Sequence, residues 1–261
     1  MLSAFLITNV KGATLTETEY NRLKLVFNDF RISAMSDEDA QKFLSTDLEN
    51  NKKVSKYYKV TETTNGTTTT EVSKEEATNA ANNILATKST SHTTTYKNLE
   101  ISAMKTGTNA YLVDVTVLWL ISPYIKSYDV FAMRTDDATV VEGTQQGTQG
   151  YIYKDGSSGV IDYSNNGTNM VKASNGFGIS MNLLDAANTY QCYISAMVRA
   201  TTEWATVYGS YQHAATNVTL AQSKSYTISH NGYGKVINFA TAVQNHYDGM
   251  QGVSIALDYT A

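Results

Sequence analysis

The chain has 261 residues, enough to bury a full hydrophobic core. Only 17% of the residues are charged and the net charge is −4, so the composition gives no basic surface to attract nucleic acid, and we expect none as a partner. The single cysteine excludes an internal disulfide framework. Eighteen tyrosines and long Ser/Thr/Asn tracts favour half-buried β-sheet over helical bundles.

The N-terminal residues 1–13 resemble the back half of a secretory signal peptide. A short apolar stretch from Leu2 to Val10 runs into the small residues Gly12 and Ala13, and it is too short to cross a bilayer. The basic start of a leader is missing, and Lys11 lies at a poor place for cleavage. We therefore expect export, to the medium or the cell surface, with an N-terminal arm packed in the protein or a neighbour as the alternative. No other stretch is long enough for a transmembrane span.

Two helices are predicted before residue 50. Thr16 and Glu19 have the reciprocal pattern of a capped helix start, and the apolar spacing that follows predicts a helix over 17–31. Ser36 and the acidic residues after it open a second, shorter helix that carries Phe43 and Leu44 on one side.

A β-hairpin and a third helix come next. Asn65-Gly66 stands between two β-prone runs in Tyr57–Val72, which is a strong hairpin signal. A capping pattern at Ser73 then opens a helix with an alanine-rich stripe. The Ser/Thr stretch near residue 90 marks the expected domain boundary. We therefore predict three parts: a leader or arm over residues 1–13, a helical pair with a hairpin and a helix over 14–90, and a β domain over 91–261.

From residue 94 onward the pattern is typical of β-strands separated by Gly/Asn/Asp turns. The predicted strands are 94–104, 110–121, 128–134, 151–153, 160–163, 177–184, 190–200, 206–213, 225–230, 236–240 and 253–259. Such a series predicts a mainly β protein, an antiparallel β-sandwich that is jelly-roll-like or a flattened barrel. Alternation along 190–198 places Cys192 in the core; Trp119 is also expected there, and Pro123 ends a strand.

The candidate binding residues lie late in the chain, where aromatic and polar side chains stand beside glycine turns. They are Trp204, Tyr208, Tyr211, His213, Tyr233, His246, Tyr247 and Asp248. Loops on a β scaffold commonly present binding residues, and aromatic faces can cover the apolar side of a sugar ring. The pattern therefore favours a carbohydrate or cell-envelope ligand.

Catalysis is the weaker interpretation of the same region. His213, His246 and Asp248 could supply a general acid and base, but they lie on separate elements without ligand spacing, and no Gly-x-Ser-x-Gly elbow occurs. We therefore predict no catalytic residue, no metal site and no cofactor. Asp136 and Asp137 allow a calcium site, although an ordinary polar turn explains them more simply.

Several phrases resemble a set of uncharacterised exported proteins of Gram-positive bacteria that have a β-rich C-terminal domain. The phrases are Ser127-Tyr-Asp-Val, Gly178-Ile-Ser-Met-Asn-Leu, Tyr208-Gly-Ser-Tyr-Gln-His-Ala, Val218-Thr-Leu-Ala-Gln-Ser-Lys-Ser-Tyr-Thr-Ile-Ser and Tyr247-Asp-Gly-Met. This resemblance covers about residues 94 to 255 and implies secretion and β architecture. It implies no activity and transfers no functional residue.

Four classes of function follow from the sequence. The first is a secreted or surface binding module for glycans or the cell envelope, favoured by aromatic loops without paired catalytic groups. The second is a membrane-active pore-forming toxin, suggested by Ser/Thr alternation in 61–72 and 89–96. The third is a structural or assembly subunit whose N-terminal arm packs into a neighbour, and the fourth is a hydrolase.

Overall fold

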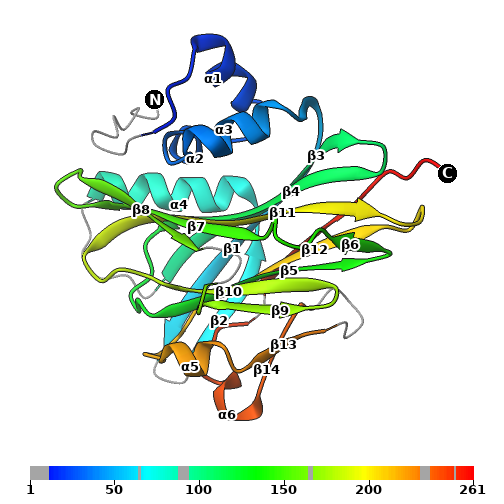
Figure 1. The fold of residues 1–261 in the computed structure, drawn as a ribbon. Coiled ribbons are helices and arrows are strands. Elements are labelled where there is room, and N and C mark those ends of the chain that lie inside the picture. The colour runs from blue at the N-terminus through cyan, green and yellow to red at the C-terminus, as the bar shows by residue number, and fades with distance from the viewer. Residues whose placement is uncertain (1–11, 64–65, 88–93, 164–166, 230–235, 250) are drawn as a thin grey trace.

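The computed structural model describes residues 12–63, 66–87, 94–163, 167–229, 236–249 and 251–261 (Figure 1). The expected leader or arm, most of residues 1–13, lies outside this range. The described chain forms two stacked antiparallel sheets with a few short helices, which confirms the predicted mainly β sandwich. None of its helices has both the length and the apolar composition needed to cross a bilayer.

The larger sheet contains most of the long strands and runs in the order β2-β1-β3-β4-β11-β7-β8, with β6 also paired to β11. Its strands are β1 Asp47–Thr63, β2 Gly66–Val72, β3 Thr94–Gly107, β4 Ala110–Ile121, β6 Ala138–Val140, β7 Gln146–Tyr153, β8 Ser158–Tyr163 and β11 Ala187–Ala200. Strand β4 ends two residues before Pro123, as predicted, because proline cannot donate to the ladder.

The smaller sheet runs in the order β15-β12-β5-β10-β9 and packs face to face on the larger one. Its strands are β5 Tyr128–Asp136, β9 Met170–Ala173, β10 Gly176–Asn182, β12 Thr206–Gln212 and β15 Gln251–Ala256. The core between the sheets contains Trp119, Cys192, Ile194 and Phe131, all almost fully buried. Trp119 and Cys192 therefore occupy the predicted core positions.

The predicted N-terminal helix is divided in two. Helix α1 spans Glu17–Leu23 and α2 spans Asp29–Ser33, because the side chain of Asn28 accepts a hydrogen bond from the backbone of Arg31 and starts a new helix. The break lets Phe27 pack edge-on against Phe43 of α3 (Asp37–Leu44), with ring centroids 4.6 Å apart. The single helix expected over 17–31 is thus corrected to two.

The N-terminal hairpin belongs to the large sheet. Strands β1 and β2 pair as predicted around residues 64–65, which lie outside the described range, and β1 also pairs with β3 from Asp47↔Lys105 to Thr61↔Thr94. The boundary expected near residue 90 therefore falls between two paired strands of one sheet. The third predicted helix is α4, Lys74–Thr87.

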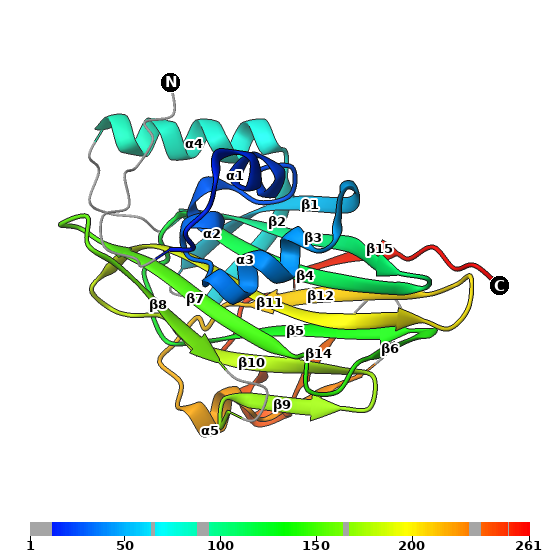
Figure 2. The same ribbon diagram turned by 45° about the horizontal axis from the view of Figure 1, so that its top comes forward.

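Helices cover the outer face of the large sheet, and the C-terminal segment covers the outer face of the small one (Figures 1 and 2). Helices α1 to α3 bury an apolar cluster against Leu112 and Met197, so β11 is buried on both of its faces. On the other side lie α5 Leu220–Ser223, β13 Tyr226–Ile228, β14 Ile237–Phe239 and α6 Thr241–Gln244. The protein is therefore built in four layers, the sandwich being the middle two.

Candidate functional site

The predicted binding residues do not gather on one surface. Trp204 follows β11 at one end of the sandwich and is 74% exposed, whereas Tyr211, His213, Tyr247 and Asp248 are buried near the opposite end of β12. The side chain of Tyr208 lies on the outer face of the small sheet, under the guanidinium of Arg134 at 4.5 Å. The His246 ring lies 3.0 Å from the Thr216 hydroxyl. Tyr233 lies outside the described residues.

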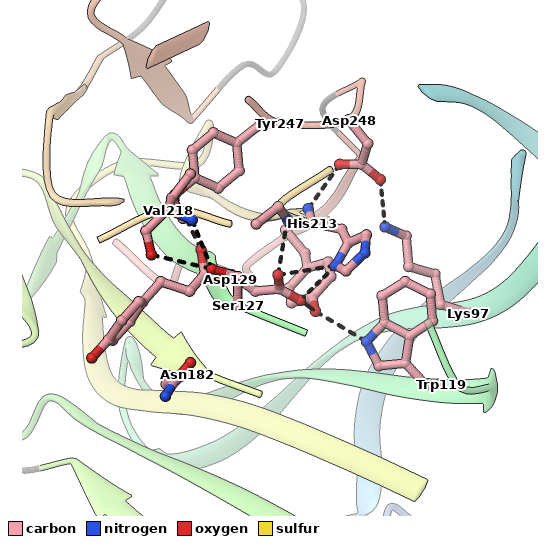
Figure 3. A network of polar contacts seen from close by, with 12 residues as sticks. Lys97, Trp119, Ser127, Asp129, Asn182, His213, Val218, Tyr247 and Asp248 are labelled. Carbon is pink, nitrogen blue, oxygen red and sulfur yellow. Dashed lines mark hydrogen bonds and ion pairs between the residues drawn. The ribbon is translucent and has the colours of Figure 1, made fainter. Parts of the chain in front are cut away.

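A buried polar network fills the end of the sandwich where His213 lies (Figure 3). Its centre is Asp129 of β5, whose carboxylate oxygens lie 2.9 and 3.0 Å from Nδ1 of His213. The same carboxylate accepts hydrogen bonds from the Tyr211 hydroxyl and from the backbone N–H of Ala214. Trp119 in turn donates its indole N–H to the Tyr211 oxygen at 3.0 Å. One carboxylate therefore organises side chains from both sheets.

Charges around His213 hold it in its protonated form. Burial alone lowers the pKa of His213, but the negative charge and hydrogen bonds of Asp129, together with Glu62, outweigh it and raise the pKa to about 9. The Nε2 atom of His213 lies 3.8 Å from Oε1 of Glu62, and neither of these atoms has a hydrogen-bond partner among the described residues. The imidazolium is thus flanked by two carboxylates from β5 and β1.

This shift predicts a dependence of stability on pH. The folded-state pKa of about 9 is above the ordinary value of 6.5, so the stabilisation is complete below pH 6.5 and is lost as the pH rises through 9. We expect the thermal midpoint of the wild-type protein to fall between pH 6.5 and pH 9. His213→Gln should flatten this part of the profile, measured by calorimetry in buffers of equal ionic strength. An equally steep fall in the variant would contradict the assignment.

A second charged pair adjoins this network. Lys97 of β3 places its ammonium 2.8 Å from Oδ2 of Asp248, and both side chains are fully buried. Asp248 also accepts hydrogen bonds from the backbone N–H of His213 at 2.8 Å and from the Thr69 hydroxyl at 3.1 Å. Its contact with His213 thus involves the backbone rather than the ring. His213, His246 and Asp248 are therefore not arranged as a hydrolytic triad.

Tyr247 and Ser127 fasten the C-terminal segment to the small sheet. The Tyr247 hydroxyl donates to the carbonyl of Tyr128 at 3.1 Å, and its ring stacks on Phe239 at 4.1 Å. Ser127 accepts a hydrogen bond from the backbone N–H of Val218 at 2.9 Å. Tyr247 is therefore part of the packing between two layers and does not present its face to a ligand.

The acidic stretch at the end of β5 forms a turn. Arg134 contacts both carboxylate oxygens of Asp136, and Asp137 adopts a positive φ of 50° between β5 and β6. Across the described residues, no group of three His, Cys, Asp or Glu side chains is placed to hold a metal ion. The described geometry at the end of β5 is that of a polar turn closed by the contact between Arg134 and Asp136.

A surface cleft lies where the helices meet the outer face of the large sheet. It has a volume of about 210 Å³. Its lining consists of Phe27, Asn28, Arg31, Lys53, Tyr57, Thr78, Asn98, Glu100, Thr116, Leu118, Leu120 and Gln191. The cleft therefore combines a few aromatic and aliphatic side chains with polar and charged groups, drawn from six elements.

The charged groups that line this cleft are Arg31, Lys53 and Glu100. The side chains of Lys53 and Glu100 are 2.8 Å apart and remain partly exposed. Burial raises the pKa of Glu100, while the ammonium of Lys53 opposes the shift. The Oε1 atom of Gln191 is buried beside them and has no hydrogen-bond partner among the described residues. The cleft thus offers both donors and acceptors beside the rings of Tyr57 and Phe27.

Neither this cleft nor the role of Lys97 was predicted from the sequence. The cleft could not be predicted from local patterns, because its lining residues come from segments as distant as residues 27 and 191, which strand pairing brings together. The role of Lys97 could have been predicted from its position. Lys97 alternates with Leu99 and Ile101 on the buried face of β3, and a charge at such a position needs a partner.

Comparison with known proteins gives weak matches. No family model and no curated protein matches the chain. Among solved structures, the pilus backbone of Streptococcus pneumoniae matches with 11% identity over 57% of this chain and 40% of that chain, at a TM-score of 0.28. A pore forming protein (8% identity, 47% and 75% covered, TM-score 0.21) and Clostridium perfringens delta-toxin (5%, 48% and 76%, 0.22) also match. At these TM-scores the likenesses support no argument about function.

Proposed function

We propose that this protein is a secreted or cell-surface binding module that takes a carbohydrate in the cleft between the helices and the large sheet. The observation that supports it is the pairing of aromatic walls with hydrogen-bonding groups in that cleft. Its volume of about 210 Å³ is below the roughly 300–1,000 Å³ of typical ligand sites, so it suits about one sugar ring of a longer glycan. Export is supported by the leader-like sequence alone.

Sugar recognition gives each part of the cleft a role. The ring of Tyr57, beside Leu118 and Leu120, can cover the apolar face of a pyranose. The hydroxyl groups at the edge of the sugar then remain available for hydrogen bonds. Glu100 and Asn98, which lie on β3 with one residue between them, face the same side of the sheet, and their side-chain oxygens can accept hydrogen bonds from those hydroxyls. The NH2 group of Asn98 already donates to Ser55 and to the carbonyl of Lys56. The Lys53 ammonium keeps Glu100 in place.

The test is a glycan array of cell-envelope fragments, followed by titration calorimetry on the hits. Glu100→Gln should weaken binding about tenfold or more, because a hydrogen bond to a charged group contributes about 1.5–3 kcal/mol. Tyr57→Ala should weaken it as well. Glu71→Gln is the matched control, since Glu71 also pairs with a lysine of β1, Lys56 at 2.9 Å, but does not line the cleft.

Trp204 supplies the competing location for the same function. If Trp204→Ala abolishes binding while Glu100→Gln leaves it unchanged, the binding surface is the exposed loop after β11 and not the cleft. If no glycan binds at high protein concentration, the carbohydrate proposal is overturned.

A further inference from the structure

The buried pair of Lys97 and Asp248 has the geometry of two groups poised for a covalent reaction. Its two members are 151 residues apart in the sequence, one on β3 and the other just before β15, and Nζ lies 2.8 Å from Oδ2 (Figure 3). Their side chains are 1% and 0% exposed, so bulk water does not separate or hydrate them. An amine held this way against a carboxyl group meets the proximity requirement for condensation.

The surroundings of Lys97 favour its uncharged form. Nζ of Lys97 lies 4.8 Å from the ring of Trp119 and 4.9 Å from the ring of Tyr211, in the interior of the sandwich. Removing two charges from water is costly, and this burial lowers the pKa of Lys97 even though Asp248 opposes the shift. Transfer of one proton from Nζ to Oδ2 leaves a neutral, nucleophilic amine beside a neutral carboxylic acid.

Two hydrogen-bond donors hold the carboxyl group of Asp248 for attack. The backbone N–H of His213 donates to Oδ1 at 2.8 Å, and the Thr69 hydroxyl donates to Oδ2 at 3.1 Å. Fixed donors of this kind stabilise the negative charge that develops on a carboxyl oxygen when its carbon is attacked. The N–H of His213 is therefore placed for the oxyanion, and the Thr69 hydroxyl for the departing oxygen.

We propose that Lys97 and Asp248 condense to an intramolecular isopeptide bond that ties β3 to the segment preceding β15. The neutral amine of Lys97 attacks Cγ of Asp248, and a C–N bond forms. The neutral amine carries two protons. One of them remains as the amide N–H, and the other is transferred to Oδ2, which already carries the proton from the first transfer. The Cγ–Oδ2 bond breaks, Oδ2 leaves as one water molecule, and no oxidant or reductant is needed.

The cross-link would tie β3 of the large sheet covalently to the segment leading into β15 of the small sheet. These strands belong to different sheets and contact each other across the core. The single cysteine, Cys192, is buried and cannot supply such a link. The amide would also remove a buried ion pair from the interior, replacing two charges with one neutral group whose remaining oxygen, Oδ1, still accepts from the backbone N–H of His213.

Intact-mass spectrometry of the full-length folded chain tests the proposal. Under denaturing conditions, the protein should be lighter than its sequence mass by one water molecule, and proteolysis should release a branched peptide that joins the segments around Lys97 and Asp248. Folded wild-type protein that keeps its full sequence mass after prolonged incubation at neutral pH overturns the proposal.

Two variants make the result specific. Lys97→Arg keeps the positive charge but replaces the amine with a non-nucleophilic guanidinium, so it should keep its full sequence mass. Asp248→Asn preserves the shape of the site and should form the same amide by losing ammonia, giving the wild-type cross-linked mass even if the arginine variant does not fold. Loss of water in folded Lys97→Arg would place the modification elsewhere and refute the assignment.

Discussion

Asp129→Ala should lower the free energy of unfolding by about 3–5 kcal/mol, the usual cost of removing one partner from a buried charged pair. Asp129 accepts hydrogen bonds from His213, Tyr211 and the backbone of Ala214, and all three donors are buried. Without this carboxylate, the imidazolium of His213 must lose its proton or rely on the more distant carboxylate of Glu62, 3.8 Å from Nε2. Urea denaturation monitored by tryptophan fluorescence measures the change, because Trp119 belongs to the same network.

Asp129→Asn is the matched control for charge. Asparagine keeps one acceptor oxygen, which can still accept from the backbone N–H of Ala214, whereas its NH2 group cannot accept from the Tyr211 hydroxyl; the loss of stability should therefore be smaller than for alanine but not zero. The pKa of His213 should also drop, and the decline of stability toward pH 9 should become shallower. A loss below about 1 kcal/mol for Asp129→Ala would show that the network contributes little beyond an ordinary hydrogen bond.

Arg31→Met should destabilise the protein by about 3–5 kcal/mol, since it leaves Asp114 buried without its charged partner. Arg31 of α2 contacts Asp114 of β4 at 3.3 Å, and its guanidinium lies 3.0 Å from the centre of the Tyr193 ring. This pair fastens the helical layer to the large sheet. Chemical denaturation should show the loss, and limited proteolysis should cut residues 12–46 faster in the variant.

The double variant Arg31→Met/Asp114→Leu separates pairing from packing. Replacing both charges by apolar side chains removes the cost of desolvation as well as the attraction, so most of the stability should return. Lys24→Met is the surface control: Lys24 pairs with the exposed Asp29 at 2.6 Å, and such pairs contribute only about 0–1 kcal/mol. If the double variant is no more stable than Arg31→Met, the specific geometry of the ion pair matters more than its charge balance.

Local patterns were enough to predict most of the strands. Each strand predicted from residue 94 onward has a counterpart in the fold, because two-residue alternation and glycine turns report directly on the pleat. The short strands β6 and β9, of three and four residues, were missed since they show no alternation of their own. The break between α1 and α2 was missed as well, because the apolar spacing of a single helix continues across Asn28, whose side chain caps a new helix in the fold.

The sequence by itself determined the architecture of this protein: a β-sandwich with a small helical part and with Trp119 and Cys192 in the core. Only the tertiary structure decided which polar residues meet. His213 contacts Asp129, Lys97 contacts Asp248, and Glu100 and Tyr57 line one cleft, through pairings between strands far apart in the chain. The reason is physical: alternation fixes which way a side chain points, whereas its partners depend on sheet order and register, which long-range packing sets.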